Sequence, residues 1–280
     1  MCENTASMTA DHFPRNAALK QFRLQLLGWF TTYHRDLPWR RNRDPYRIWI
    51  SEIMLQQTRV AAVIHYFEKF CARFPDVAAL AEAEEAEVLR MWSGLGYYSR
   101  ARNLQAAAQQ MVREHGGNFP ATEKTIRGLR GIGKYTTNAI LSIAFGEKHA
   151  VLDGNVARVI ARLGAIRGDL RESAHWGLLQ KTADHLLARE SPGNWNQAMM
   201  ELGATVCTPR SPKCLLCPVA KFCHARKLGI QELIPEKRKK RATVEVTLAV
   251  VVMADRRGRC ILLPPPKNGT GKIADDDIPT

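Results

Sequence analysis

Apolar residues recur at intervals of three and four positions along the chain from Asn16 to about Val206, and this spacing predicts amphipathic helices. Prolines and glycine turns separate one helical segment from the next, and no convincing alternating pattern interrupts them. The main predicted helices cover residues 18–33, 48–58, 60–74, 77–83, 84–91, 101–115, 122–129, 135–145, 156–163, 176–188 and 194–202. The pattern therefore predicts an all-α array over this part of the chain.

The segment at residues 48–58 is nearly apolar. Two apolar blocks cover most of its helical circumference and leave one polar strip of Glu52, Gln56 and Arg59. A carboxyl group flanked by so much hydrocarbon would have a raised pKa, which is the property of a general acid near neutral pH. The alternative is that Glu52 lies on a solvated face, as most helical glutamates do.

The composition changes after Cys223. The basic run at residues 237–241 is either a solvated linker or a phosphate contact, and residues 244–253 form the only strand-like run, which turns into residues 260–263. Three prolines follow, and the polar tail from Lys267 is expected to be disordered.

The charge of the 280-residue chain indicates a polyanionic partner. The formal net charge is +14 and the pI is near 9.7, and basic side chains that neutralise phosphates release counterions. No run approaches the 18 apolar residues of a membrane span, and the N-terminus lacks the features of a signal peptide. These patterns favour nucleic acid over membrane, and a cytoplasmic location.

Four of the seven cysteines, Cys207, Cys214, Cys217 and Cys223, are grouped in one short segment. Their Cys-x6-Cys-x2-Cys-x5-Cys spacing can hold one tetrahedral metal ion or one cluster, and spacing alone does not choose zinc over iron. Four free thiols in a core are a poor explanation, because three prolines stiffen the same loop.

Two short turns carry further candidate chemistry. Gly131-Ile132-Gly133 joins two predicted helices, so that free backbone N–H groups, with Lys134 adjacent, form an anion site typical of a helix-hairpin-helix. A lone Gly-x-Gly is usually only a turn. Asp153-Gly154-Asn155, by itself, is a helix-capping turn more readily than a catalytic site.

These features, together with Trp49–Thr58, Gly94–Tyr98 and Leu152–Val156, resemble the adenine DNA glycosylases of the MutY family, within the endonuclease III-like superfamily, from about Leu37 to Cys223. The resemblance implies a monofunctional base-excision repair enzyme that hydrolyses adenine mispaired with 8-oxoguanine or guanine. It implies a monomer that acts on double-stranded DNA at the nucleoid, with a [4Fe-4S] cluster on the four cysteines.

The resemblance also implies roles for individual residues. Glu52 would protonate the flipped adenine at N7, and Asp153, at a helix N-terminus that favours its anion, would stabilise the sugar cation. Asn155 and Tyr135 would orient Glu52 and the adenine. The other implied contacts are Trp39, Arg40 and Gln197 in the adenine pocket, Gln57, Thr58 and Tyr97 at the duplex or opposite base, and Gly131, Gly133 and Lys134 in the hairpin. Met199 and Met200 are expected in the core.

Tyr135 separates the first interpretation from its main rival. Bifunctional relatives carry a lysine there, whose amine attacks C1′, and Lys134 points about 100° away on a helix. The alternatives are an endonuclease III-type glycosylase and lyase acting on oxidised pyrimidines, and a non-enzymatic metal-cluster DNA-binding module. Arg130 departs from the proline usual in the family's hairpin.

The expected fold class is an all-α, two-lobed helix-hairpin-helix DNA glycosylase with a short C-terminal β fragment. The expected parts are residues 1–36 (N-terminal helix of the cluster lobe), 37–147 (six-helix barrel with the hairpin), 148–228 (iron–sulfur cluster lobe), 229–243 (basic linker) and 244–280 (truncated MutT-like fragment and tail). The short fragment predicts reduced discrimination between 8-oxoguanine and guanine. The carboxyl groups of Glu52 and Asp153 are expected roughly 5 to 9 Å apart.

Overall fold

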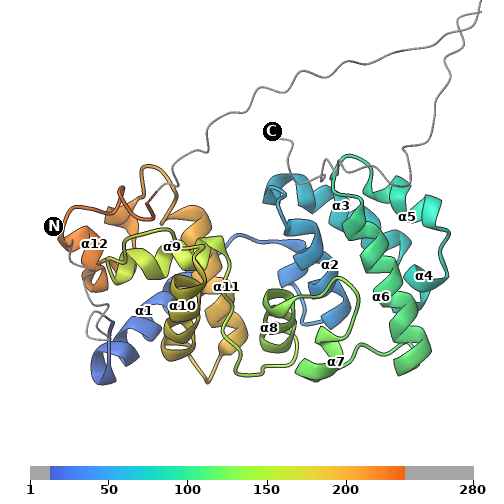
Figure 1. Ribbon diagram of the computed structural model, residues 1–280, viewed down its shortest axis with the longest axis horizontal. Helices are drawn as coiled ribbons and strands as arrows, with labels where there is room; N and C mark the ends of the chain where they lie inside the picture. Colours follow the sequence, from blue (N-terminus) through green and yellow to red (C-terminus); the bar gives the residue numbers. More distant parts are fainter. Residues whose placement is uncertain (1–12, 237–280) are drawn as a thin grey trace, which may run out of the picture. The chain divides into compact units, whose positions relative to one another are not determined.

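The computed structural model describes residues 13–236, which belong to one compact unit, and every regular element within this range is helical (Figure 1). This confirms the predicted all-α class; the strand-like run and the tail lie outside the described residues. The α-helices are α1 (Asn16–Tyr33), α2 (Pro45–Leu55), α3 (Val60–Arg73), α4 (Val77–Glu82), α5 (Glu85–Trp92), α6 (Ser99–His115), α7 (Glu123–Arg127), α8 (Lys134–Ile143), α9 (Gly154–Leu163), α10 (Ser173–Leu186), α11 (Pro192–Thr205) and α12 (His224–Lys227). Short 3₁₀ turns lie at Pro38–Arg40, Cys214–Leu216 and Ala220–Phe222.

Two hydrophobic cores divide these helices into two lobes. The first lobe contains α2 to α8, and its buried side chains include Trp49 and Trp92. The second lobe combines α1 with α9 to α12, where the Phe22 ring packs edge-on against Trp195 at 5.6 Å and Phe222 at 5.4 Å. Helix α8 contacts both α2 and α11, so it joins the two lobes. The N-terminal helix thus completes a lobe built from the second half of the described chain (Figure 1).

Side-chain caps fix where several helices begin. Asp44, Asp76, Thr122 and Asp153 each accept a hydrogen bond from a backbone N–H in the first turn of α2, α4, α7 and α9. Such a cap stabilises a helix by about 1 kcal/mol. The cap of α9 matters most for function, because it sets the position of the Asp153 carboxyl.

Helix α2 ends earlier than the sequence pattern predicts. Its last residue is Leu55, Gln56 is extended, and Gln57 has a left-handed φ of 54°. The Arg100 guanidinium donates to the carbonyls of Ile53 and Met54, which the helix leaves free at this end. The predicted polar strip through Arg59 is therefore wrong, because residues 56–59 leave the helix.

The helix-hairpin-helix forms from α7, the turn at residues 128–133, and α8. Gly131 has a φ of 76°, and a Cβ there would lie 2.8 Å from the Cβ of Asn103. Arg130, which replaces the proline usual in the family, donates from Nε to the Asn103 side chain at 3.2 Å. With arginine in place of proline, the turn is thus hydrogen-bonded to Asn103 of α6.

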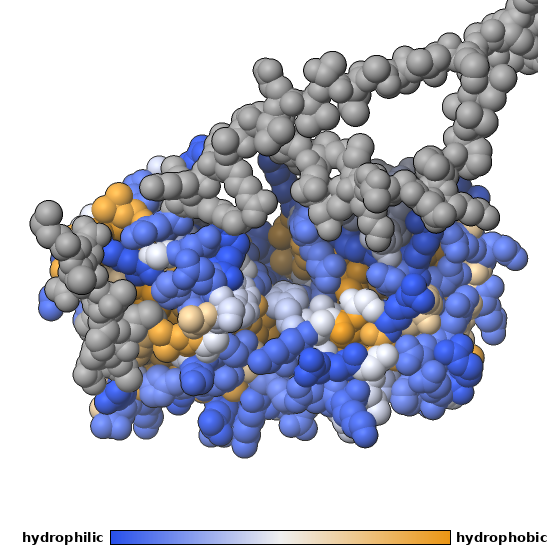
Figure 2. Space-filling model, viewed as in Figure 1, coloured by the Kyte–Doolittle hydropathy of each residue, from blue (hydrophilic) through white to orange (hydrophobic). Residues whose placement is uncertain are grey.

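The surface seen in Figure 2 is largely hydrophilic. Several large apolar side chains are nonetheless exposed, among them Tyr97 and Tyr98 before α6 and Leu215 and Leu216 between two of the clustered cysteines. None of the helices in residues 13–236 has the length and apolar character needed to cross a membrane.

Candidate active site

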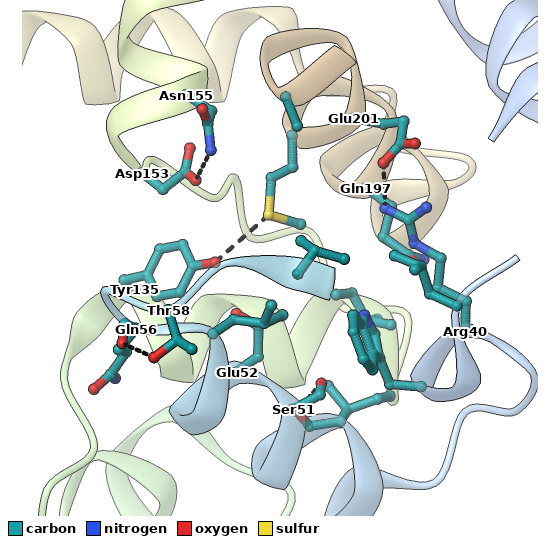
Figure 3. A pocket seen from close by; sticks show the side chains of 18 of the residues that line it. Arg40, Ser51, Glu52, Gln56, Thr58, Tyr135, Asp153, Asn155, Gln197 and Glu201 are labelled. Atoms are coloured by element: carbon teal, nitrogen blue, oxygen red, sulfur yellow. Dashed lines mark hydrogen bonds and ion pairs between the residues drawn. The ribbon is translucent and has the colours of Figure 1, made fainter. Parts of the chain in front are cut away.

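A cavity of about 630 Å³ opens between the two lobes and is lined by residues from α2, α8, α10 and α11 and from the start of α9 (Figure 3). This volume is in the range of small-molecule sites. Nine of the predicted site residues line it, although they are scattered along the chain: Trp39, Arg40, Glu52, Gln57, Thr58, Tyr135, Asp153, Asn155 and Gln197.

Glu52 lies on α2 with only 5% of its surface exposed, so the alternative of a solvated side chain is wrong. Its Oε2 atom is buried without a hydrogen-bond partner in the described structure. Burial raises the pKa of Glu52 to about 7; Tyr135 and Arg40 oppose the rise, and the charge of Asp153 adds to it. The carboxyl group is therefore substantially protonated near neutral pH, as a general acid requires.

Tyr135, on α8, lies beside Glu52 in the cavity. Its hydroxyl donates to the Sδ atom of Met200 at 3.5 Å (Figure 3). Burial, followed by the charges of Glu52 and Asp153, raises the pKa of Tyr135 well above its ordinary value, so the phenol keeps its proton. Met199 is in the core as predicted, but Met200 is a cavity residue, because its thioether faces this phenol.

Asp153 is the N-cap of α9 and is held by two hydrogen bonds. Its carboxylate accepts from the Val156 backbone N–H at 2.7 Å and from Asn155 Nδ2 at 3.1 Å. Asn155 in turn accepts from Arg158 Nη2 at 2.8 Å. Burial raises the pKa of Asp153 above its ordinary value, and these hydrogen bonds and the charge of Arg158 offset part of that rise. Fixed donors of this kind stabilise the carboxylate anion of Asp153. Within the described residues, the Oε2 atom of Glu52 has no such donor.

Sequence reasoning missed a buried ion cluster on the wall of the cavity. Glu201 on α11 is only 1% exposed and accepts from Arg35 Nε at 2.7 Å and from Arg40 Nη2 at 2.9 Å. Burial opposes its ionisation, yet the hydrogen bonds and charges of the two arginines hold the pKa of Glu201 below its ordinary value. The sequence could have indicated that Glu201 lies near the cavity, because it follows the predicted site residue Gln197 by four residues and so lies on the same face of the helix.

Other wall residues were also not anticipated as site residues, among them Arg35, Gln56, Trp176 and Met200. Conversely, four predicted contacts lie away from the cavity. Tyr97, Gly131, Gly133 and Lys134 are on the exposed surface of the first lobe, with Tyr97 53% exposed. They are placed to meet a large partner rather than a base inside the cavity.

The four clustered cysteines converge beside α9. The pKa of the Cys217 thiol is raised to about 12, chiefly by burial, with smaller contributions from the nearby Cys207, Cys223 and Cys214 sulfurs. Arg162 donates from Nη1 to Cys207 Sγ at 3.3 Å. Cationic hydrogen-bond donors next to sulfur are suited to thiolate ligands.

The ligand set by itself suits two kinds of metal centre. Four cysteine thiolates ligate either one zinc ion or one [4Fe-4S] cluster. When bound, the cluster would be held by four cysteines of the segment between α11 and α12, beside Arg162 of α9.

A helix-hairpin-helix joined to a two-lobed helical body, with two carboxyl groups in the cleft and a cysteine-rich loop, defines the class of base-excision DNA repair proteins. The chain belongs to the HhH-GPD superfamily of base excision DNA repair proteins, whose profile matches residues 50–182. Residues 207–223 match the iron-sulfur binding domain of endonuclease III. The cofactor prediction of a [4Fe-4S] cluster is thereby confirmed.

Known proteins similar to the chain include curated adenine DNA glycosylases. It is 44% identical to that of Homo sapiens over 93% of this chain and 49% of the relative, and 45% identical to that of Mus musculus over 79% and 45%. A solved thermostable thymine-DNA glycosylase is 32% identical with a TM-score of 0.67, covering 75% of this chain and 97% of that one. The chain thus spans about half the length of the curated relatives it matches.

Proposed function

We propose that the protein is a monofunctional adenine DNA glycosylase of base excision repair. The observation that carries this proposal is the environment of Glu52, a buried carboxyl with a pKa of about 7 in a cavity that also holds the hydrogen-bonded Asp153. The adenine DNA glycosylases among the relatives support the choice of base.

In the proposed reaction, the target nucleotide leaves the duplex and its base enters the cavity. Glu52 donates its proton to N7 of the adenine, which weakens the bond between N9 and C1′ and makes the base a better leaving group. The Asp153 carboxylate stabilises the cation that develops on the sugar. Water then adds its oxygen to C1′, and its proton passes to a carboxylate.

The acid favours adenine over a pyrimidine. Adenine offers N7, a ring nitrogen that accepts a proton, whereas thymine has no such acceptor and leaves as an anion. A neutral carboxyl without a partner on Oε2 is suited to the purine. Tyr135, a phenol that keeps its proton, can support this carboxyl but supplies no amine for a Schiff base.

The proposed partner is double-stranded DNA that holds adenine opposite 8-oxoguanine or guanine, bound by a monomer. The hairpin N–H groups with Lys134 would hold a phosphate, and Gln57, Thr58 and Tyr97 would fill the gap left by the extruded base. We also propose that the two lobes correspond to the barrel at residues 37–147 and the cluster lobe completed by residues 148–228.

The test uses duplexes with one adenine opposite guanine, 8-oxoguanine or thymine, analysed with and without alkali. Adenine release with strand scission that requires alkali is the expected result. Scission without alkali, or trapping of the wild-type protein by borohydride, would identify a bifunctional enzyme, and binding without release would leave only a DNA-binding module.

Tyr135→Lys provides a positive control for the trapping step. A lysine at this position places an amine in the cavity, so the variant should form a weak borohydride-trapped adduct. Lys134→Ala, added to Tyr135→Lys, tests whether Lys134 supplies the amine: because Lys134 does not line the cavity, the adduct should persist at DNA concentrations that saturate binding.

A further inference from the structure

Arg100, near the start of α6, links two loops that are separate in sequence. Its guanidinium donates at 2.5 to 3.3 Å to five backbone carbonyls and one hydroxyl. The acceptors in the first loop, at the end of α2, are the carbonyls of Ile53, Met54 and Gln56 and the Thr58 hydroxyl; those in the turn before α6 are the carbonyls of Leu95 and Gly96. One side chain therefore sets the distance between the two loops.

Each loop presents one exposed residue in an unfavourable backbone conformation. Gln57 in the first loop has a φ of 54°, and Tyr97 in the second has a φ of 47°. Residues other than glycine adopt this left-handed region only when their surroundings hold them there. The Arg100 guanidinium also lies 5.6 Å from the centre of the Tyr97 ring. The hydrogen bonds of Arg100 constrain the backbone of both loops beside these two residues.

The guanidinium and the loops depend on each other. Burial disfavours the charged guanidinium, which lowers the pKa of Arg100, and the six acceptors offset that cost only when both loops are in place. A lysine would keep the charge but has a single nitrogen, so it cannot reproduce the planar fork that reaches both loops.

We propose that Arg100 is a positioning residue for base extrusion, holding the loop at residues 56–58 and the turn at residues 94–97 so that Gln57 and Tyr97 enter the duplex as one wedge. This inference rests on the proposed function. Arg100 itself lines no part of the catalytic cavity, so its effect would fall on extrusion of the base and not on the chemical step.

The experiment measures extrusion separately from excision. Duplexes carry the fluorescent adenine isomer 2-aminopurine opposite guanine, and the Glu52→Gln background prevents base release. Adding Arg100→Lys should lower the extrusion equilibrium constant about tenfold, as expected when hydrogen bonds from a charged donor are lost. Affinity for undamaged duplex should change less than about twofold, because the charge remains.

Arg102→Lys is the matched control on the same helix, since the ion pair of Arg102 with Glu85 is exposed. It should leave extrusion unchanged. Equal losses for the two variants would overturn the proposal, as would an unchanged extrusion constant in Arg100→Lys.

A double-mutant cycle tests whether Arg100 acts through the wedge. In a background carrying Gln57→Ala and Tyr97→Ala, Arg100→Lys should have less than about a twofold further effect on extrusion. A full tenfold loss in that background would show that Arg100 acts on overall folding or directly on DNA, and would refute the positioning role.

A gentler variant covers the case in which Arg100→Lys melts below the assay temperature. Thr58→Val removes one acceptor of the Arg100 guanidinium and should lower extrusion about two- to threefold. Because Thr58 is itself a proposed duplex contact, Thr58→Ser, which keeps the hydroxyl that Arg100 binds, is the matched control and should retain extrusion. Equal losses for the two variants would refute the positioning role. Wild-type protein distinguishes the two proposals: if it releases no adenine, the proposed function fails, whereas release with unaltered extrusion in the variants defeats only the role of Arg100.

Discussion

Glu52→Gln should stabilise the protein at alkaline pH while it abolishes adenine release. The pKa of Glu52 is raised from 4.5 to about 7 by burial. Between these values the folded protein retains a proton that the unfolded chain has lost, so the free energy of unfolding falls as pH rises through this window. The difference between these two pKa values corresponds to about 3 kcal/mol, present as a penalty above pH 7 and absent below pH 4.5.

The magnitude converts into a measurable melting shift. Glutamine has nearly the shape of the protonated carboxyl and never ionises, so it escapes the penalty. At about 2–4 °C for each kcal/mol in domains approaching this size, Glu52→Gln should melt about 6–12 °C above wild type at pH 8 and close to wild type at pH 4.5. The comparison uses preparations with equal cluster content, followed by circular dichroism.

The pH dependence of the difference is the decisive quantity. Glu147→Gln makes the same chemical change at an exposed position and should change the melting temperature little at either pH. If the difference between Glu52→Gln and wild type is the same at pH 4.5 and pH 8, Glu52 does not titrate in the folded protein with a raised pKa, and the reasoning about the acid is refuted.

The remaining predictions address the same site and the hairpin. Single-turnover adenine release should decline as pH rises through about 7, because Glu52 loses its proton there. Asp153→Asn removes a charge that raises the pKa of Glu52, so it should move the pH at which the Glu52-dependent loss of stability is half complete to a lower value. An unmoved midpoint of that loss would contradict the coupling between Glu52 and Asp153. Glu201→Gln should cost about 3 kcal/mol or more in urea unfolding, because it leaves buried arginine charge unpaired; a loss below about 1 kcal/mol would show that the cluster relaxes. Gly131→Ala should lower the free energy of unfolding by about 1–3 kcal/mol and weaken binding to duplex DNA, because the φ of Gly131 is 76° and an added Cβ would lie 2.8 Å from Asn103. Unchanged binding in gel-shift titrations would show that the hairpin does not contact DNA.

The sequence by itself determined the secondary structure and those site features that depend on residue spacing along the chain. Apolar spacing placed every long helix, because burial of one face is a local periodic property. The cysteine spacing gave a metal-binding loop, since a loop this short cannot hold its sulfurs far apart. The order of the motifs, including Glu52 and Asp153, indicated the superfamily that the comparison with known proteins confirmed.

Only the tertiary structure decided which of these residues share an environment. The burial of Glu52, and with it the raised pKa, depends on α8 packing against α2 beside the Asp153 cap. The end of α2 is bound by Arg100, which lies more than forty residues away in sequence from the carbonyls that it contacts there. The sequence pattern does not distinguish Glu201 from other helical glutamates; its ion pairs with Arg35 and Arg40 form only in the folded chain. Desolvation and ion pairing are properties of what surrounds a group in three dimensions, and helical periodicity records only which face is apolar.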